Sequence, residues 1–170
     1  MVLKTDISLL ELKALVRELI GEATIQLDAE NWKGWLNLCT ENFLYSITSF
    51  SPEINKDMIY MRMDKKELVD MTDMLPKHNT DHSPLTRHTS VYRVTVDETP
   101  GSISAYSAVT VHQHLLDGIN SHIDSGESRL FLVGEYLDEF ILDENQAPKF
   151  KNRELKLRNR RLDKGSHWPI

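Results

Sequence analysis

Cysteine and histidine side chains decide which redox chemistry this sequence could support. An iron–sulfur cluster held by two cysteines and two histidines needs a second cysteine, but Cys39 is the one cysteine among 170 residues. The chain therefore cannot bind such a cluster by itself. Cys39 lies in a predicted helix beside an apolar residue, where a buried and unreactive thiol is the usual outcome.

Seven histidines remain as possible metal ligands. An iron site of the facial-triad type needs two histidines and a carboxylate that converge on one point. His112 and His114 lie two residues apart in a predicted strand and share a face, and His78 and His82 lie near Asp81 in a predicted loop. Surface histidines are the more frequent outcome for both pairs. We therefore assign this chain no metal ligand, no cofactor-binding residue and no catalytic residue.

Acid–base catalysis would need a histidine and a carboxylate side by side in a pocket. A strongly curved sheet closed by helices forms a cone, and such a cone can hold a small molecule. The residues that could point into it are Tyr45, His88, Tyr92, His112 and Asp138. A hydrogen-bonded core histidine is the commoner arrangement, so catalysis by this chain is kept as an alternative.

Length and composition indicate one globular domain over residues 1–170. Hydrophobic residues make up 40% and charged residues 27% of the chain, which is ordinary for a soluble domain. No apolar run approaches the roughly 20 residues of a membrane-spanning helix, and residues 1–6 do not resemble a signal peptide. A single cysteine rules out an internal disulfide, so we expect a cytoplasmic protein. Glycine-rich phosphate loops, nucleophile elbows and helical metal motifs are absent from the sequence.

Charge is distributed unevenly along the chain, whose formal net charge is −6. Residues 149–164 contain eight of the 20 Lys and Arg residues but two acidic residues. A basic strand could contact the phosphates of a nucleic acid, but neither interleaved aromatic residues nor a nucleic-acid-binding motif accompanies it. We favour the alternative that these cations face acidic neighbours or an acidic partner protein.

Two helices are predicted before the first strand. Ser8 and Glu11 form a capping box, and apolar residues at helical spacing follow, which predicts a helix over residues 9–28. Its apolar stripe comprises Leu9, Leu12, Val16, Leu19 and Ala23. In a second, shorter helix Trp32 and Trp35 share one face, and we expect them to anchor the first helix against a sheet.

Most of the remaining chain has the pattern of strands. Strands are predicted at residues 43–50, 86–97 and 103–115, and a third helix is predicted at residues 65–75. The order is therefore two helices, one strand, a helix and a meander of four longer strands. An antiparallel sheet with the helices on one face is the expected layering.

The longest predicted feature is a hairpin over residues 129–163. Leu155 and Leu157 of its return strand share one face, but Phe150 has the opposite phase. A bulge at residues 151–153 would bring all three apolar side chains to the same face. Strands of this length curl, and the helices must fill the concave side of the sheet.

Short motifs between residues 22 and 153 resemble, in the same order, those of a known family. The matching residues are Glu22-Ala23, Leu27-Asp28, Trp35-Leu36, Leu38, Tyr45, Arg87-His88, Gly134, Asp138 and Phe150-Lys151-Asn152-Arg153. Together they resemble the small (beta) subunits of Rieske-type, ring-hydroxylating oxygenases. Three features depart from that family: no Asn closely follows Arg87-His88, Phe150 stands where Trp is frequent, and residues 164–170 have no clear counterpart. These departures indicate a divergent branch, such as the oxygenases that act on alkanesulfonates, methanesulfonate among them.

The resemblance implies a cystatin-like, nuclear-transport-factor-2-like α+β fold, in which a curved antiparallel or mixed sheet forms a cone with N-terminal helices on its concave face. It also implies that a large alpha subunit carries the Rieske [2Fe–2S] cluster and the mononuclear iron, and that this chain carries neither. Three alpha and three beta subunits would form an NAD(P)H-dependent oxygenase that hydroxylates an aromatic or small organic substrate, with the beta subunit supporting the assembly. Neither nucleic acid nor membrane is an expected partner.

Arginine and aromatic residues contribute most at protein interfaces. We therefore expect Arg153, Arg158, Arg160 and Trp168 to take part in the subunit contacts.

Two alternatives come from other functional classes. The first is a stand-alone isomerase, dehydratase or cyclase of the same fold, which would use a His–carboxylate pair inside the cone. The second is a module that binds a small molecule without catalysis.

Overall fold

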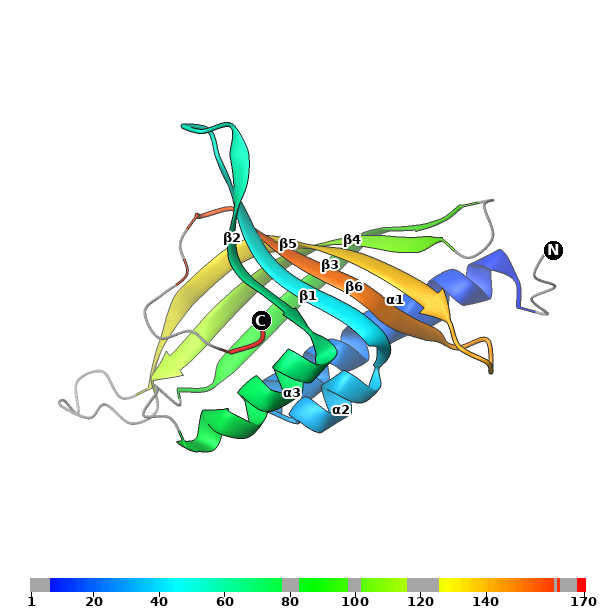
Figure 1. Cartoon of the computed structure of the whole chain (residues 1–170), viewed down its shortest axis with the longest axis horizontal. Helices are drawn as coiled ribbons and strands as arrows, with labels where there is room; N and C mark the ends of the chain where they lie inside the picture. The colour runs from blue at the N-terminus through cyan, green and yellow to red at the C-terminus, as the bar shows by residue number, and fades with distance from the viewer. Residues whose placement is uncertain (1–6, 78–82, 98–101, 116–125, 161, 163–167) are drawn as a thin grey trace.

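A six-stranded sheet in the order β2-β1-β6-β5-β4-β3 forms the framework of the computed structural model, and the helices lie against one of its faces (Figure 1). The structure describes residues 7–77, 83–97, 102–115, 126–160, 162 and 168–170. The elements are α1 (Leu9–Asp28), α2 (Trp32–Asn37), β1 (Cys39–Ser51), β2 (Lys56–Asp64), α3 (Lys65–Met74), a 3-10 turn (Leu75–Lys77), β3 (Leu85–Val96), β4 (Ile103–Leu115), β5 (Glu127–Leu142) and β6 (Pro148–Leu157).

The sheet is mixed. β1 and β6 run parallel, and the other neighbouring strands pair antiparallel. Buried apolar side chains from the helices and from all six strands form one continuous cluster. None of the helices in the described ranges combines the length and the apolar character that a membrane span requires.

Helix α1 has the predicted bounds and the predicted start. The Ser8 side chain accepts a hydrogen bond from the Glu11 N–H, and the Glu11 carboxylate accepts one from the Ser8 N–H, which confirms the capping box. Its buried stripe consists of Leu12, Val16, Ile20, Ala23 and Leu27. Leu9 is 56% exposed, because the stripe begins one turn later than the spacing indicated.

Trp35 of α2 is the largest fully buried side chain of the described chain. Its indole ring lies nearly perpendicular to the rings of Phe43 and Tyr45 on β1, with centroid distances of 5.9 and 5.8 Å. Such edge-to-face pairs add to the free energy of apolar burial. Trp35 therefore anchors α2 to the sheet. The prediction was that Trp32 and Trp35 together anchor the first helix to the sheet, but the Trp32 ring lies against Trp168 instead.

Strand β2 was not predicted from the sequence. It pairs antiparallel with β1 and forms one edge of the sheet. Along β2 most side chains are exposed and Met61 is the buried one, so the strand lacks the regular apolar alternation that marks a half-buried strand. The adjoining helix α3 begins with a second capping box, formed by Asp64 and Glu67.

The hairpin of β5 and β6 carries the predicted bulge. Phe140 pairs with Phe150 and Glu139 pairs with Asn152, so Lys151 is the extra residue on β6. This shift brings Phe150, Leu155 and Leu157 to the buried face, as predicted. The regular strand ends at Leu157, however, earlier than the predicted end at residue 163.

Candidate functional site

A charged pair lies at the centre of the cone. Asp138 on β5 and Arg153 on β6 are paired residues of adjacent strands, and both point to the helix-covered face. Two parallel hydrogen bonds of 2.8 Å join the Arg153 guanidinium to the Asp138 carboxylate. The guanidinium also lies 4.2 Å from the ring centroid of Tyr136 and 4.5 Å from that of Phe150. Arg153 is 1% exposed, so it lies inside the fold and not on the surface where we expected a subunit contact.

Burial governs the ionisation of this interior. Burial raises the pKa of the Asp138 carboxyl, and the Arg153 guanidinium opposes that shift. Burial disfavours the charge of Arg153, but Asp138 outweighs this effect and raises the pKa of the guanidinium. Burial also raises the pKa of Tyr45 and of Tyr136. Both phenols are therefore neutral hydrogen-bonding groups at physiological pH.

Several buried polar atoms near this pair have no protein partner among the described residues. They are Tyr136 Oη, Ser107 Oγ and Arg153 Nη1. Ser107 and Tyr136 face each other across β4 and β5. Buried polar groups of this kind are usually satisfied by ordered water. The described part of the buried interior contains no histidine.

Residues 168–170 close one end of the cone, where Arg87 holds them. The Arg87 guanidinium donates 2.7 Å hydrogen bonds to Asp28 Oδ1 at the end of α1 and to the Pro169 carbonyl oxygen. Tyr45 Oη accepts a 2.9 Å hydrogen bond from the Ile170 N–H. This arrangement joins α1, β1 and β3 to the segment.

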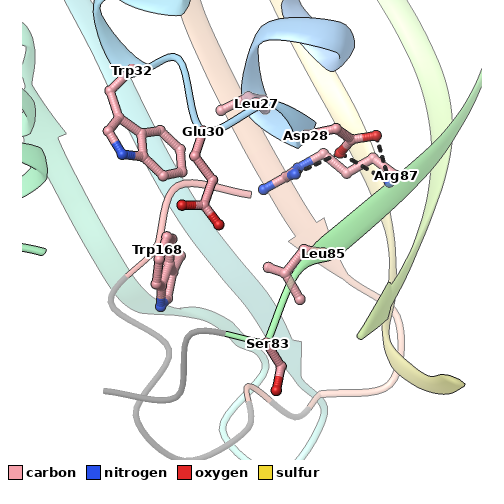
Figure 2. Close-up of a pocket in the computed structure, with 8 residues that line it drawn as sticks. All are labelled: Leu27, Asp28, Glu30, Trp32, Ser83, Leu85, Arg87 and Trp168. Carbon is pink, nitrogen blue, oxygen red and sulfur yellow. Dashed lines mark hydrogen bonds and ion pairs between the residues drawn. The ribbon is translucent and has the colours of Figure 1, made fainter. Parts of the chain in front are cut away.

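Figure 2 shows the small cavity beside this contact, with Trp32 and Trp168 on one side and the Arg87–Asp28 pair on the other. Its volume is about 10 Å³, enough for one water molecule. The Trp168 ring lies 5.6 Å from the Trp32 ring, centroid to centroid. Trp168 is therefore half-buried against its own chain. The cavity is too small for an organic substrate.

The described histidines lie outside the cone. His88 and His112 stack edge to face, with ring centroids 5.3 Å apart, and His88 is exposed. The ring nitrogens of His114 are hydrogen-bonded to Ser128 and Thr86. Among the described residues no cluster of three or more His, Cys, Asp or Glu side chains is arranged to hold a metal ion. His78, Asp81 and His82 lie outside the described residues.

The five residues proposed from sequence to point into the cone therefore separate into two groups. Tyr45 and Asp138 lie inside it. Tyr92 is 64% exposed, and His88 and His112 lie on the outer side of the sheet with it. A register in which Arg87 points inward turns His88 outward, because neighbouring residues of a strand alternate.

The cations of the basic hairpin face acidic side chains of the same chain, as expected. The pairs are Lys151–Glu139, Arg153–Asp138, Lys156–Asp57, Arg158–Glu135 and Arg160–Glu53. Lys156 and Arg160 connect the hairpin to the β1–β2 hairpin, a contact that sequence reasoning missed because β2 was not predicted. Hydrogen bonds from Ser51, from its own backbone and from Arg160 lower the pKa of Glu53 to about 2. The side chains of Arg158 and Arg160 are 64% and 43% exposed, so both remain available to a partner.

The Cys39 thiol should be unreactive in the folded protein. Burial raises its pKa to about 12, so at pH 8 about one thiol in 10,000 is ionised. At pH 8 we expect the Cys39 thiol of the native protein to remain unmodified by a disulfide reagent. The same thiol in urea-unfolded protein should react completely within that time. Rapid modification of one thiol in the native protein would contradict this burial.

Sequence comparison finds two related oxygenase subunits, and no family model matches the chain. The chain is 57% identical over 155 residues to methanesulfonate monooxygenase hydroxylase subunit beta of Methylosulfonomonas methylovora, covering 91% of this chain and 85% of the relative. It is 30% identical over 144 residues to 2-aminobenzenesulfonate 2,3-dioxygenase subunit beta of an Alcaligenes species, covering 85% of this chain and 89% of the relative.

Solved structures of similar shape confirm the cystatin-like fold. A beta subunit from Novosphingobium aromaticivorans, assigned to an aromatic-ring-hydroxylating dioxygenase, superposes with a TM-score of 0.75 at 21% identity and covers 92% of this chain and 95% of its own. A nuclear-transport-factor-2-like protein with a cystatin-like fold, from the same species, has a TM-score of 0.65 at 16% identity over 90% of this chain and 86% of its own.

Proposed function

This chain belongs to the family of hydroxylase beta subunits of multicomponent oxygenases, and from that premise we propose how it assembles and what its complex oxidises. A beta subunit of this family implies an alpha subunit as partner. The similarity over most of the chain to two such subunits is the observation that carries the proposal. This chain contributes structure to the oxygenase, and the chemistry belongs to the complex.

Both iron centres of the oxygenase, a Rieske cluster and a mononuclear iron, belong to the alpha subunit in this proposal. The donor set of this chain does not fit either centre. One cysteine in 170 residues cannot supply the two thiolates of a Rieske cluster. The described histidines either stack on each other or bond to hydroxyl groups, away from the buried carboxylate Asp138.

The substrate class that we propose is an organic sulfonate. Both relatives are named for sulfonate substrates, one aliphatic and one aromatic, and the higher identity favours a small alkanesulfonate. The test is NADH-dependent oxygen uptake by the reconstituted complex with methanesulfonate, 2-aminobenzenesulfonate and unsubstituted benzene. Turnover of benzene without turnover of either sulfonate would contradict the proposal.

The stand-alone enzyme has less support. It requires a His–carboxylate pair inside the cone, and the buried carboxylate Asp138 is instead held by Arg153. The described side chains buried in the fold are apolar residues, tyrosines, serines and threonines together with Arg87, Asp138 and Arg153. An acid–base mechanism would have to proceed without a described histidine.

We propose three alpha and three beta subunits in the assembly, with Arg158, Arg160 and Trp168 at subunit contacts and Arg153 supporting the hairpin from inside. The double charge reversal Arg158→Glu, Arg160→Glu should reduce co-purification of the alpha subunit at least about tenfold, because exposed arginines at a contact become repulsive. Arg129→Glu is the matched control, since Arg129 is an equally exposed arginine paired with a neighbouring glutamate. Unchanged co-purification of the double variant would exclude the basic hairpin from the contact.

A cytoplasmic location and a single domain over residues 1–170 complete the proposal. The single cysteine of the sequence supports the cytoplasmic location. The continuous buried cluster of the described chain supports the second.

A further inference from the structure

Residues 168–170, which we call the plug, are held at the mouth of the cone in the way that a protein holds a bound peptide. The plug belongs to no helix or strand, and it lies on the concave side of the sheet, at the red end of the ribbon in Figure 1. Pro169 and Ile170 are buried, and Ile170 is part of the apolar cluster. A buried segment without secondary structure depends on surrounding side chains to satisfy its backbone.

Two buried side chains satisfy the backbone groups of Pro169 and Ile170. Proline has no N–H, and the Pro169 carbonyl oxygen accepts a 2.7 Å hydrogen bond from the Arg87 guanidinium. The Ile170 N–H donates to Tyr45 Oη at 2.9 Å, and Tyr45 Oη donates to the Ile170 carbonyl oxygen at 3.1 Å. Arg87 and Tyr45 are 4% and 0% exposed. The groups that bind the plug are therefore fixed by the fold.

The chemistry of this site favours particular residue types in the plug. Proline brings no N–H that burial would leave unpaired, and its fixed φ lowers the conformational entropy lost on binding. Ile170 places a branched apolar side chain among buried neighbours, where a polar side chain would lose its hydration. The site therefore suits a proline followed by an aliphatic residue.

The plug can leave without exposing an unpaired charge. Arg87 also donates to Asp28 at the end of α1, so its charge stays paired when Pro169 departs. The fit around the plug is incomplete, because the small cavity of Figure 2 lies beside Trp168, and Arg87 Nε is buried without a partner among the described residues. Voids and unpaired donors weaken a contact. These features favour a segment that separates from the fold before the sheet unfolds.

We propose that the mouth of the cone is a peptide-binding site, that the plug is its internal ligand, and that the plug leaves and returns while the sheet stays folded. The ligand class is an apolar peptide in which proline precedes a branched aliphatic residue. Once the plug is absent, the site binds such a peptide from solution. Site and plug belong to one chain, so this binding goes beyond the proposed function and is independent of the oxygenase assembly.

Hydrogen exchange of the full chain, resolved by residue, tests whether the plug moves by itself. The Ile170 amide should exchange at least about tenfold faster than the amide of Leu155, which is buried in the interior strand β6. Low urea should leave the Ile170 rate unchanged, because local release exposes little surface. Exchange of Ile170 at the rate of Leu155, with the same urea dependence, would make the plug an integral part of the core and overturn the proposal.

Tyr45→Phe should raise the exchange rate of the Ile170 amide about tenfold further, because both hydrogen bonds to Ile170 are lost while the aromatic ring remains. Tyr136→Phe is the matched control. Tyr136 is an equally buried tyrosine whose hydroxyl has no partner among the described residues, so its removal should leave the Ile170 rate unchanged. Equal effects of the two substitutions would contradict recognition of the plug by Tyr45.

A variant that ends at His167 tests binding from solution. Its Tm should be lower than that of the full chain, and the acetylated peptide Trp-Pro-Ile should restore most of the loss. Millimolar peptide is required, because the tether gives the plug an effective concentration in that range. The peptide with the Ile170→Ser change should bind at least about tenfold more weakly, since it buries less apolar surface.

The full chain is the control for the site, because its own plug competes with the peptide and should abolish most of the response. Equal stabilisation of the shortened variant by both peptides, or equal binding of the peptide to the full chain, would overturn the proposal. If the shortened variant does not fold, the full chain with Ile170→Ser replaces it. The Trp-Pro-Ile peptide should then raise the Tm of that variant, and an unchanged Tm would count against the site.

Discussion

Replacing Asp138 by asparagine should lower the free energy of unfolding by about 3–5 kcal/mol. The change leaves the Arg153 guanidinium, which is 1% exposed, without its anionic partner in a low-dielectric interior. Arg153 also stacks on Tyr136 and Phe150, so it cannot turn toward solvent without emptying the centre of the cone. Urea unfolding at fixed protein concentration measures the loss, because self-association would otherwise shift the midpoint.

Glu139→Gln is the matched control for this measurement. Glu139 is the next residue along β5, and its ion pair with Lys151 has both side chains 56% exposed. Exposed ion pairs contribute about 0–1 kcal/mol, so this variant should unfold near the wild-type midpoint. The double variant Asp138→Leu, Arg153→Met removes both charges and should be more stable than Asp138→Asn. Equal loss from Asp138→Asn and Glu139→Gln would contradict a buried, structural pair.

Trp35→Ala should lower the free energy of unfolding by about 3–5 kcal/mol. The indole ring is fully buried and contacts Phe43 and Tyr45, and the removed volume cannot be refilled by the short helix α2. Differential scanning calorimetry would show the loss as a lower Tm. Trp35→Phe should retain part of the stability, because an aromatic ring still reaches β1.

Trp32→Ala provides the comparison for Trp35. Trp32 is half-buried against Trp168 at the small cavity of Figure 2, so its removal should cost clearly less. A larger loss from Trp32→Ala than from Trp35→Ala would mean that residues 168–170 stabilise the fold more than the contact of α2 with the sheet.

Elements with regular apolar spacing could be predicted from the sequence. Helix α1, with its capping box at Ser8, and strand β4 were found at their observed bounds. The bulge at Lys151 was also inferred, because Phe150 and Leu155 could face one core in no other way. Strand β2 lacked such a pattern, since it is an edge strand whose side chains mostly face solvent.

The placement of Arg153 shows how an inference from residue type went wrong. Arginine is common at interfaces, so Arg153 was grouped with Arg158 and Arg160. Alternation along β6 places Arg153 on the same face as Leu155 and Leu157, and this signal was available in the sequence. Its partner Asp138 had been placed inside the cone correctly, but the register that joins the two requires the structure.

Contacts between residues that are far apart in the sequence could not be predicted from the sequence. The contact of Arg87 with Asp28 and Pro169, and the contact of Lys156 with Asp57, join residues separated by 59, 82 and 99 positions. Such pairs depend on strand order and sheet curvature, which local propensity does not encode. The parallel pairing of β1 with β6 is the clearest example.

The most direct test of the central claim is the subunit and iron content of this protein isolated from its own cells. The native complex would be separated into its chains after mass measurement, and the iron in each chain would be determined. The account predicts equal amounts of this 19.7 kDa chain and a larger second chain, with the iron in the second chain. A native assembly that contains this chain and no other protein would contradict the account.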